Sequence, residues 1–186
     1  MKIYVGSGEN RFTMSRGSFK YKQKMSGKRQ LTLQNKEKTE NGYLLTYMDE
    51  KNKESYSFKV TQENDKISVD FEGKVPKGVN RFWVTIKTNP NEKLYGCGET
   101  YSKFNLKGEN VRIWVAEHQN TSRISTKIIK EKLFGKHPEK ILPFKKYESY
   151  YAQPTFTSSD KYYVHVNVNT YSEFDFTKPE AITFYL

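Results

Sequence analysis

The amino-acid sequence predicts an all-β protein, a twisted antiparallel β-sandwich with one long loop or short helical insertion. Aromatic residues make up 15% of the 186 residues, and aromatic and β-branched side chains suit a pleated, half-buried surface. Apolar and polar residues alternate in many short runs, with the two-residue period of a strand. Gly, Asn and charged residues separate these runs at short spacing, which is typical of sandwiches and barrels.

The first hundred residues contain five alternating runs that we expect to be strands. They are SFKYKQ (18–23), RQLTLQN (29–35), GYLLTYMD (42–49), SYSFKVTQ (55–62) and KISVDFEG (66–73). A longer turn is expected over Lys74–Asn80. RFWVTIKT (81–88) then has the more continuous apolar pattern of a buried strand. Strands return in the last forty residues, at SYYAQPTF (149–156), KYYVHVNVN (161–169), EFDF (173–176) and AITFYL (181–186).

Between these two groups of strands, residues 114–147 form a long excursion. Apolar residues recur at roughly helical spacing from Ser122 to Leu133, and Thr121 or Ser122 could cap the start, so we expect a short helix or helical loop there. Pro138 and Pro143 then break any regular element. Long excursions in compact domains are usually functional or disordered.

Composition argues against several classes of protein. The formal net charge is +11, but only six of the 32 basic residues are Arg, and the lysines are interleaved with acids. This pattern favours a solvated surface over a nucleic-acid site. The single cysteine is compatible with a reducing compartment, and no apolar run resembles a secretory signal or a membrane span. We therefore expect a cytoplasmic protein that binds neither nucleic acid nor membrane.

The motif Tyr95-Gly96-Cys97-Gly98-Glu99 is the sharpest local signal. Two glycines separated by one residue permit positive φ or close backbone approach, as a tight strand exit requires. The third glycine of a dinucleotide fingerprint and the Lys-Ser/Thr of a P-loop are missing. Glu99 is interpreted as a carboxylate satisfied by its neighbours rather than as a sugar ligand. Cys97 is interpreted as a small packed side chain rather than a nucleophile.

The segment from Trp114 to Arg123 is the best candidate for binding. It combines an aromatic ring with carboxyl and amide groups and a guanidinium, and sugars offer an apolar face and paired hydroxyls to such a set. An ordinary polar loop is the alternative. His118, His137 and His165 lack the spacing of metal ligands, so we expect no metal site and no cofactor. Pro154 is expected at an edge or bulge.

Several blocks together resemble one known family. They are LYGCGETYSKFNLKG (94–108), IWVAEHQNTSR (113–123), YYAQPTFTSSDKYYVHVNVNT (150–170) and FDF (174–176), with SRGSFK (15–20) and NRFWVTI (80–86) upstream. The order and spacing resemble the N-terminal domain of glycoside hydrolase family 31, the retaining α-glycosidases, and most of all its sulfoquinovosidase-like branch. That resemblance implies a galactose-mutarotase-like sandwich forming a single domain over residues 1–186.

The resemblance also implies where the chemistry lies. In the family the catalytic aspartates belong to a (β/α)8 barrel that follows this domain, and a barrel needs about 250 residues, so none fits within this chain. No catalytic residue is expected here, and the 186-residue chain alone should be inactive. By the same resemblance Glu117, Gln119 and Arg123, beside Trp114, would contribute to binding a carbohydrate substrate at the barrel mouth.

Three classes of function remain open on the sequence. The first is a non-catalytic domain that supports the barrel of an α-glycosidase; its partner is then the barrel of the same polypeptide. The second is a stand-alone carbohydrate-binding module, and the third, less favoured, is a basic nucleic-acid-binding domain. An isolated domain of the first kind is expected to expose an apolar patch where the barrel docks, and could form a homo-oligomer through it.

Overall fold

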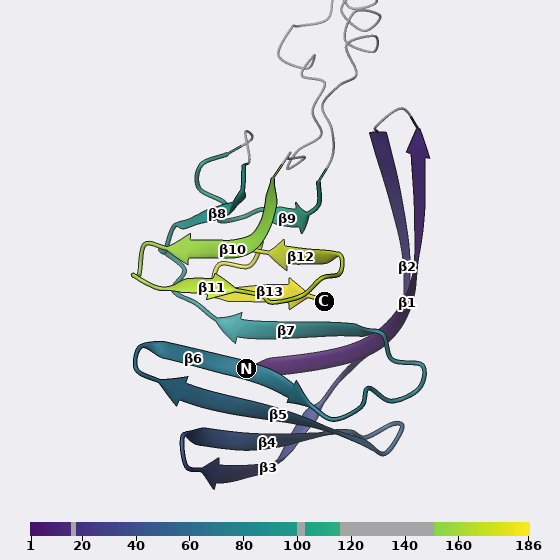
Figure 1. The fold of residues 1–186 in the computed structure, drawn as a ribbon, viewed down its shortest axis with the longest axis vertical. Helices are drawn as coiled ribbons and strands as arrows, with labels where there is room; N and C mark the ends of the chain where they lie inside the picture. The colour runs from purple at the N-terminus through teal and green to yellow at the C-terminus, as the bar shows by residue number, and fades with distance from the viewer. Residues whose placement is uncertain (16–17, 100–102, 116–150) are drawn as a thin grey trace, which may run out of the picture. The chain divides into compact units, whose positions relative to one another are not determined.

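A computed structural model of the protein describes residues 1–15, 18–99, 103–115 and 151–186 (Figure 1). Every regular element in these ranges is a β-strand, which confirms the predicted all-β class. The chain forms two compact units, and residues make most of their contacts within their own unit. Unit 1 comprises Met1–Glu9 and Gln23–Thr85, and unit 2 comprises Asn10–Lys22 and Ile86–Leu186. The helix expected over 122–133 lies outside the described residues.

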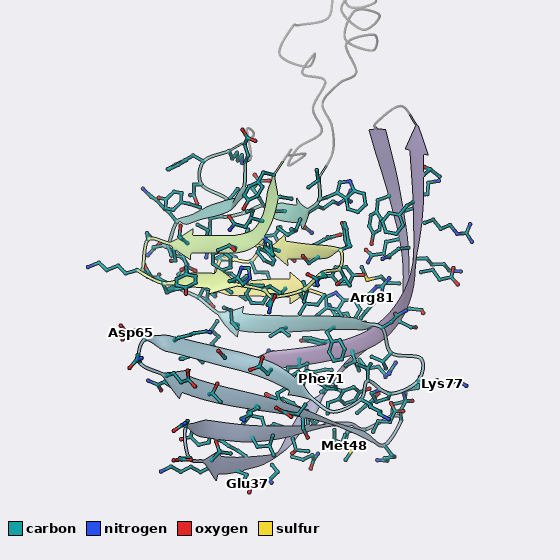
Figure 2. All side chains as sticks on the ribbon, in the orientation of Figure 1. Glu37, Met48, Asp65, Phe71, Lys77 and Arg81 are labelled. Carbon is teal, nitrogen blue, oxygen red and sulfur yellow. The ribbon has the colours of Figure 1, made fainter. Side chains whose placement is uncertain are left out.

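Unit 1 is built around a four-stranded antiparallel sheet whose strands follow one another in sequence order (Figure 1). Its strands are β3 (Thr32–Thr39), β4 (Gly42–Asp49), β5 (Glu54–Glu63) and β6 (Lys66–Glu72). Tight turns join them, and Asp65 marks the turn between β5 and β6 in Figure 2. Short connections of this kind permit only antiparallel neighbours, so the predicted run of alternating segments leads directly to this sheet.

Three further strands contribute to unit 1, namely β1 (Lys2–Ser15), β2 (Ser18–Gln30) and β7 (Arg81–Lys87). β1 pairs antiparallel with β7, from Lys2 opposite Thr85 to Gly6 opposite Arg81. The Asn80 side chain adds a clamp, since its amide donates to the Gly8 carbonyl at 3.1 Å and its oxygen accepts from the Gly8 N–H at 2.9 Å. Chain segments some eighty positions apart are thus held in register.

The core of unit 1 lies on one face of the four-stranded sheet. Tyr47 opposite Tyr56 and Leu45 opposite Phe58 point to the same side, because residues directly opposite in antiparallel strands share a face. Aromatic rings meet there edge to face, as in the Tyr47–Phe58 pair, with centroids 5.8 Å apart at 90°. The buried members are Ile3, Val5, Leu31, Tyr47, Tyr56, Phe58 and Val79, with Leu45, Phe71 and Phe82 packed against them.

At the end of β4 a buried carboxylate closes the turn into β5. Asp49 is 1% exposed and accepts a hydrogen bond from Arg29 Nε at 2.7 Å and from the Lys51 N–H at 3.1 Å. Burial alone would raise the pKa of this carboxyl, but the hydrogen bonds from Arg29 and from the backbone of Asn52 and Lys51, with the charge of Arg29, outweigh it and lower the pKa.

We therefore expect Asp49→Asn to change how the stability of the protein depends on pH. Because the pKa of Asp49 is lower in the folded state than in the unfolded chain, where it is about 3.9, its contribution is present above that value and lost as pH falls through the folded pKa. Urea unfolding between neutral pH and pH 2 should show this loss in the parent but less of it in Asp49→Asn. Parallel curves for the two proteins would contradict the assignment.

Unit 2 contains two three-stranded antiparallel groups, each with its middle strand paired on both sides. In one group β10 (Ala152–Ser158) lies between β11 (Tyr163–His165) and β8 (Leu94–Gly98). In the other, β12 (Ser172–Asp175) lies between β9 (Asn110–Ile113) and β13 (Ala181–Tyr185). These strands cover much of the four C-terminal segments that alternation predicted.

A phenylalanine cluster forms the core of unit 2. Phe156 on β10 is fully buried, and its ring lies 5.2 Å from that of Phe176 and 5.8 Å from that of Phe174, at steep angles. Phe184 on β13 stacks on it at 6.2 Å. Offset and edge-to-face pairs of this kind are favoured over face-to-face sandwiches. The cluster packs one strand group of unit 2 against the other.

A buried polar network fixes the start of β8 to the end of β10. Glu92 accepts from Ser158 Oγ at 2.6 Å and from the Tyr162 hydroxyl at 2.7 Å, and Lys107 Nζ lies 3.4 Å away. Burial tends to raise the pKa of Glu92, but the hydrogen bonds from Ser158 and Tyr162 and the charge of Lys107 lower it overall. Tyr162 shows the reciprocal effect, since burial and the neighbouring carboxylate raise its pKa to about 12.

Candidate functional site

Trp114 directly follows β9 and lies in an aromatic cluster of unit 2. Its ring stacks almost parallel to that of Phe12, with centroids 5.4 Å apart and 6° between the planes. It also meets the rings of Tyr171 at 5.8 Å and Tyr21 at 6.0 Å. Phe12 and Tyr21 come from the part of the β1–β2 hairpin that belongs to unit 2. We call Phe12, Tyr21, Trp114 and Tyr171 the aromatic cluster.

Strand register explains why these rings meet. Val111 pairs with Phe174 and both are fully buried, whereas Arg112 pairs with Glu173 on the opposite face. Because side chains alternate between the two faces of a strand, Trp114 and Tyr171 follow Arg112 and Glu173 onto that same face. The hairpin rings pack onto it, and Tyr21 stacks on Tyr171 with centroids 4.1 Å apart.

Polar groups border the aromatic cluster. The Tyr171 hydroxyl donates to Glu173 Oε1 at 2.5 Å, and Arg112 Nε lies 3.9 Å from the same oxygen. Burial, followed by the hydrogen bond to Glu173, raises the pKa of Tyr171 far above its usual value, so Tyr171 is a neutral donor. The Arg112 side chain is 60% exposed, and its guanidinium can reach an anionic or hydroxyl-rich ligand in solution.

Among the described residues this arrangement offers a surface for binding, and its one carboxylate, that of Glu173, is already engaged by Tyr171 and lies near Arg112. It offers an aromatic surface on which Phe12 is 50% exposed, together with the Arg112 guanidinium and the Glu173 carboxylate. Sequence analysis missed every member of this arrangement except Trp114, and Arg112 is the one for which a local signal existed. Arg112 lies two residues before Trp114, and residues two apart in a strand share a face. The sequence could therefore have indicated that the two side chains lie together.

Of the predicted substrate-binding residues, only Trp114 can be placed. Glu117, Gln119 and Arg123 lie outside the described residues, as do His118 and His137. His165 is exposed, and its Nδ1 lies 2.7 Å from Thr155 Oγ1 in the paired strand.

Among the described residues no group of three or more His, Cys, Asp or Glu is placed to hold a metal ion. In the same ranges no helix is long and apolar enough to cross a membrane.

The glycine motif forms the predicted tight strand exit. Gly96, Cys97 and Gly98 have φ of 119°, 65° and 91°. A Cβ on Gly98 would lie 1.9 Å from the Tyr151 carbonyl oxygen, so the close backbone approach is confirmed as well. Register between β8 and β10 shifts between Ala152 and Phe156, which places Pro154 in the irregular stretch, as expected.

The structure bears out the interpretation of Cys97 as a small packed side chain. Cys97 is buried, and burial raises its pKa to about 12, so it is not a reactive thiolate. The Glu99 side chain is exposed, and its backbone N–H donates to the Tyr151 carbonyl at 2.9 Å. Glu99 thus follows the last residue of β8 at the point where β8 and β10 are held together.

Two surface depressions in the described residues include no residue of the aromatic cluster or of the glycine motif. Both lie in unit 1 and are wide open to solvent. One is lined by residues of the β3–β4 turn, including Glu40 and Tyr43, and the other by residues of β4, β5 and β6 that include Leu44, Lys59 and Glu72. Neither resembles an enclosed, largely apolar ligand pocket.

Comparison with known proteins places the chain in a family. Residues 2–126 match the family described as the glycosyl hydrolase 31 N-terminal galactose mutarotase-like domain. The chain is 29% identical to a sulfoquinovosidase of Escherichia coli over 96% of its own length and 26% of the relative. It is 32% identical to a sulfoquinovosidase of Agrobacterium fabrum over 53% of its length and 14% of the relative.

A solved structure agrees with these matches. A family 31 sulfoquinovosidase from E. rectale, determined with the aza-sugar inhibitor IFGSQ, superposes with a TM-score of 0.80 at 30% identity, over 99% of this chain and 26% of that one. The chain therefore spans about a quarter of the length of such relatives. The fold is the all-β sandwich of mutarotase-like domains, and the chain belongs to the glycoside hydrolase family 31 N-terminal domain family.

Proposed function

We propose that this chain is the non-catalytic N-terminal domain of a retaining α-glycosidase, which supports the catalytic barrel and contributes a loop to the substrate entrance. The observation that carries the proposal is the match over nearly the whole chain to enzymes about four times as long. The relatives are sulfoquinovosidases by name, so an α-sulfoquinovoside is the first substrate to test and an α-glucoside the second.

The described carboxylates support a non-catalytic role. A retaining glycosidase needs two carboxyl groups about 5–5.5 Å apart, one to act as nucleophile and one as acid and base. Each buried carboxylate in the described ranges is instead engaged with a cation, Asp49 with Arg29, Glu92 with Lys107 and Glu109 with Lys103. A carboxylate paired in this way serves the fold, because the cation offsets the cost of burying its charge.

Trp114 supports the proposed contribution to the substrate entrance. Its half-buried ring is held between Phe12 and Tyr171, and the chain continues from it towards Glu117, Gln119 and Arg123. In the proposal the aromatic cluster anchors the start of this loop, and the polar side chains of the loop complete the carbohydrate pocket.

We further propose a cytoplasmic location. Cys97, the only cysteine of the sequence, is buried and free, which is compatible with a reducing compartment.

The test is Arg123→Ala in the full-length polypeptide. We expect kcat/KM on an aryl α-sulfoquinovoside to fall by the equivalent of about 1.5–3 kcal/mol, the worth of a hydrogen bond to a charged group. Lys66→Ala on β6, an exposed cation of unit 1, is the matched control and should leave kcat/KM unchanged. An unchanged value for Arg123→Ala would make this loop a polar connector.

The 186-residue chain itself should release no nitrophenol from aryl α-glucosides or aryl α-sulfoquinovosides. Turnover that survives purification and disappears in Glu99→Gln or Glu117→Gln would contradict the non-catalytic role.

The carbohydrate-binding module remains the second candidate because Phe12 of the aromatic cluster is half exposed. It predicts that the chain alone binds glycans and that Phe12→Ala abolishes binding.

A further inference from the structure

One face of the β11–β10–β8 sheet is formed by uncharged side chains, several of them aromatic. Thr157 on β10 lies opposite both Tyr163 on β11 and Tyr95 on β8, so these three side chains form a row on one side of the sheet. His165 and Thr155 form the next row on that side. The ring of Phe104 lies against that of Tyr95, with centroids 4.7 Å apart. We call Tyr95, Phe104, Thr155, Thr157, Tyr163 and His165 the open face.

The open face exposes large aromatic side chains. Phe104 is 84% exposed and Tyr163 is 66% exposed, whereas Phe156, on the opposite side of the same sheet, is fully buried. An aromatic side chain can bury about 150–250 Å², so these two alone leave roughly 300 Å² uncovered. That is already the size of the largest apolar patch of a typical monomer, and patches of this size are often functional.

Charge separates the open face from an ordinary solvent-exposed face of the same molecule. None of the six residues of the open face is charged, and the exposed Lys93 and Lys161, two residues before Tyr95 and Tyr163, lie at its border. The outward face of the four-stranded sheet in unit 1 provides the comparison, because there Lys59 pairs with Asp70 and Ser57 with Glu72. Interface cores are depleted in charge and enriched in aromatic residues, so the open face has the composition of an interface.

We propose that the open face is the surface on which the catalytic barrel of the same polypeptide docks. This rests on the proposed function, in which a barrel follows this domain. About three quarters of the length of the E. rectale relative lies outside the part that this chain covers. Domains of one chain typically share an interface of about 600–1,500 Å². An uncharged face with two prominent rings suits such a contact better than permanent exposure to water.

The experiment compares the 186-residue chain with the full-length polypeptide by hydroxyl-radical footprinting. In the full-length protein the oxidation rates of Tyr163 and Phe104 should fall several-fold, because both side chains would become buried. Ile67 on β6, which is 67% exposed in unit 1, is the matched control and should react at the same rate in both proteins. Equal rates for Tyr163 and Phe104 in the two proteins would overturn the proposal.

Two variants test the same face by stability. Tyr163→Lys should lower the Tm of the full-length polypeptide but leave that of the 186-residue chain nearly unchanged, because the side chain is exposed in the latter. Ile67→Lys should be neutral in both proteins. An equal loss of Tm in both proteins for Tyr163→Lys would show a role within the domain and would count against docking.

The outcomes also separate this proposal from the proposed function. A full-length protein that hydrolyses an α-glycoside while its open face stays reactive would refute the docking site alone. A polypeptide without a barrel or without glycosidase activity would refute the proposed function. Protection of Tyr163 in the 186-residue chain that increases with its concentration would identify a second copy as the occupant, and protection by added maltose would identify a glycan. Either result would overturn docking of the barrel.

Discussion

Phe156→Ala should lower the free energy of unfolding of unit 2 by about 3–5 kcal/mol, the cost of removing a fully buried phenylalanine ring. Phe156 is the centre of the core of this unit, because its ring contacts those of Phe174, Phe176 and Phe184. Alanine would leave a cavity that β10, paired on both sides, cannot close by moving.

Urea unfolding followed by tryptophan fluorescence measures this effect. Trp83 lies in unit 1 and Trp114 in unit 2, so a Trp83→Phe background makes the signal report unit 2. Phe104→Ala is the control, since the same truncation at an 84% exposed ring should change the unfolding free energy by less than about 0.5 kcal/mol. Similar losses for the two variants would mean that Phe156 is not the core residue that we describe.

Gly98→Ala should destabilise unit 2 by about 2–5 kcal/mol. A Cβ at this position would lie 1.9 Å from the Tyr151 carbonyl oxygen and 2.9 Å from the Gln153 nitrogen, and both are backbone atoms of the paired segment. Relief of the clash requires β8 and β10 to separate, which adds an overpacking cost of about 1–3 kcal/mol. The φ of 91° adds about 1–2 kcal/mol for any residue with a Cβ.

Gly108→Ala separates these two contributions. Gly108 is in the same unit and has a φ of 86°, but a Cβ there would meet no atom within 4 Å. It should therefore show only the backbone cost of about 1–2 kcal/mol. The same urea titration measures both variants, and an equal effect at the two positions would show that the close approach of β8 to β10 does not matter.

Alternation predicted most strands because the two-residue period is a local property of a chain with one buried face. The run GYLLTYMD coincides with β4, and SYSFKVTQ and KISVDFEG coincide with β5 and β6 to within a residue or two. The turn after Gly98 was predictable for a similar reason, since glycine is the residue that tolerates both positive φ and a backbone neighbour at close range.

β1 was not predicted, although it is the first strand of the chain. Gly6 and Gly8 interrupt its apolar pattern, and the strand is held by pairing with β7, about eighty residues further on. Local periodicity carries no information about such a partner. The same limit applies to Asp49. The alternation in β4 does not reveal that Arg29 donates a hydrogen bond to Asp49 at 2.7 Å, which offsets the cost of burying the carboxylate.

The sequence by itself determined the all-β class, the positions of most strands, the tight exit at Gly96–Gly98 and the family, because each depends on local periodicity, on backbone freedom or on a motif. Only the tertiary structure decided that Phe12 and Tyr21 would pack with Trp114, that Arg112 would lie beside them, and that Tyr163 and Phe104 would stay exposed. These outcomes depend on strand register between distant segments, and register is a property of the assembled sheet.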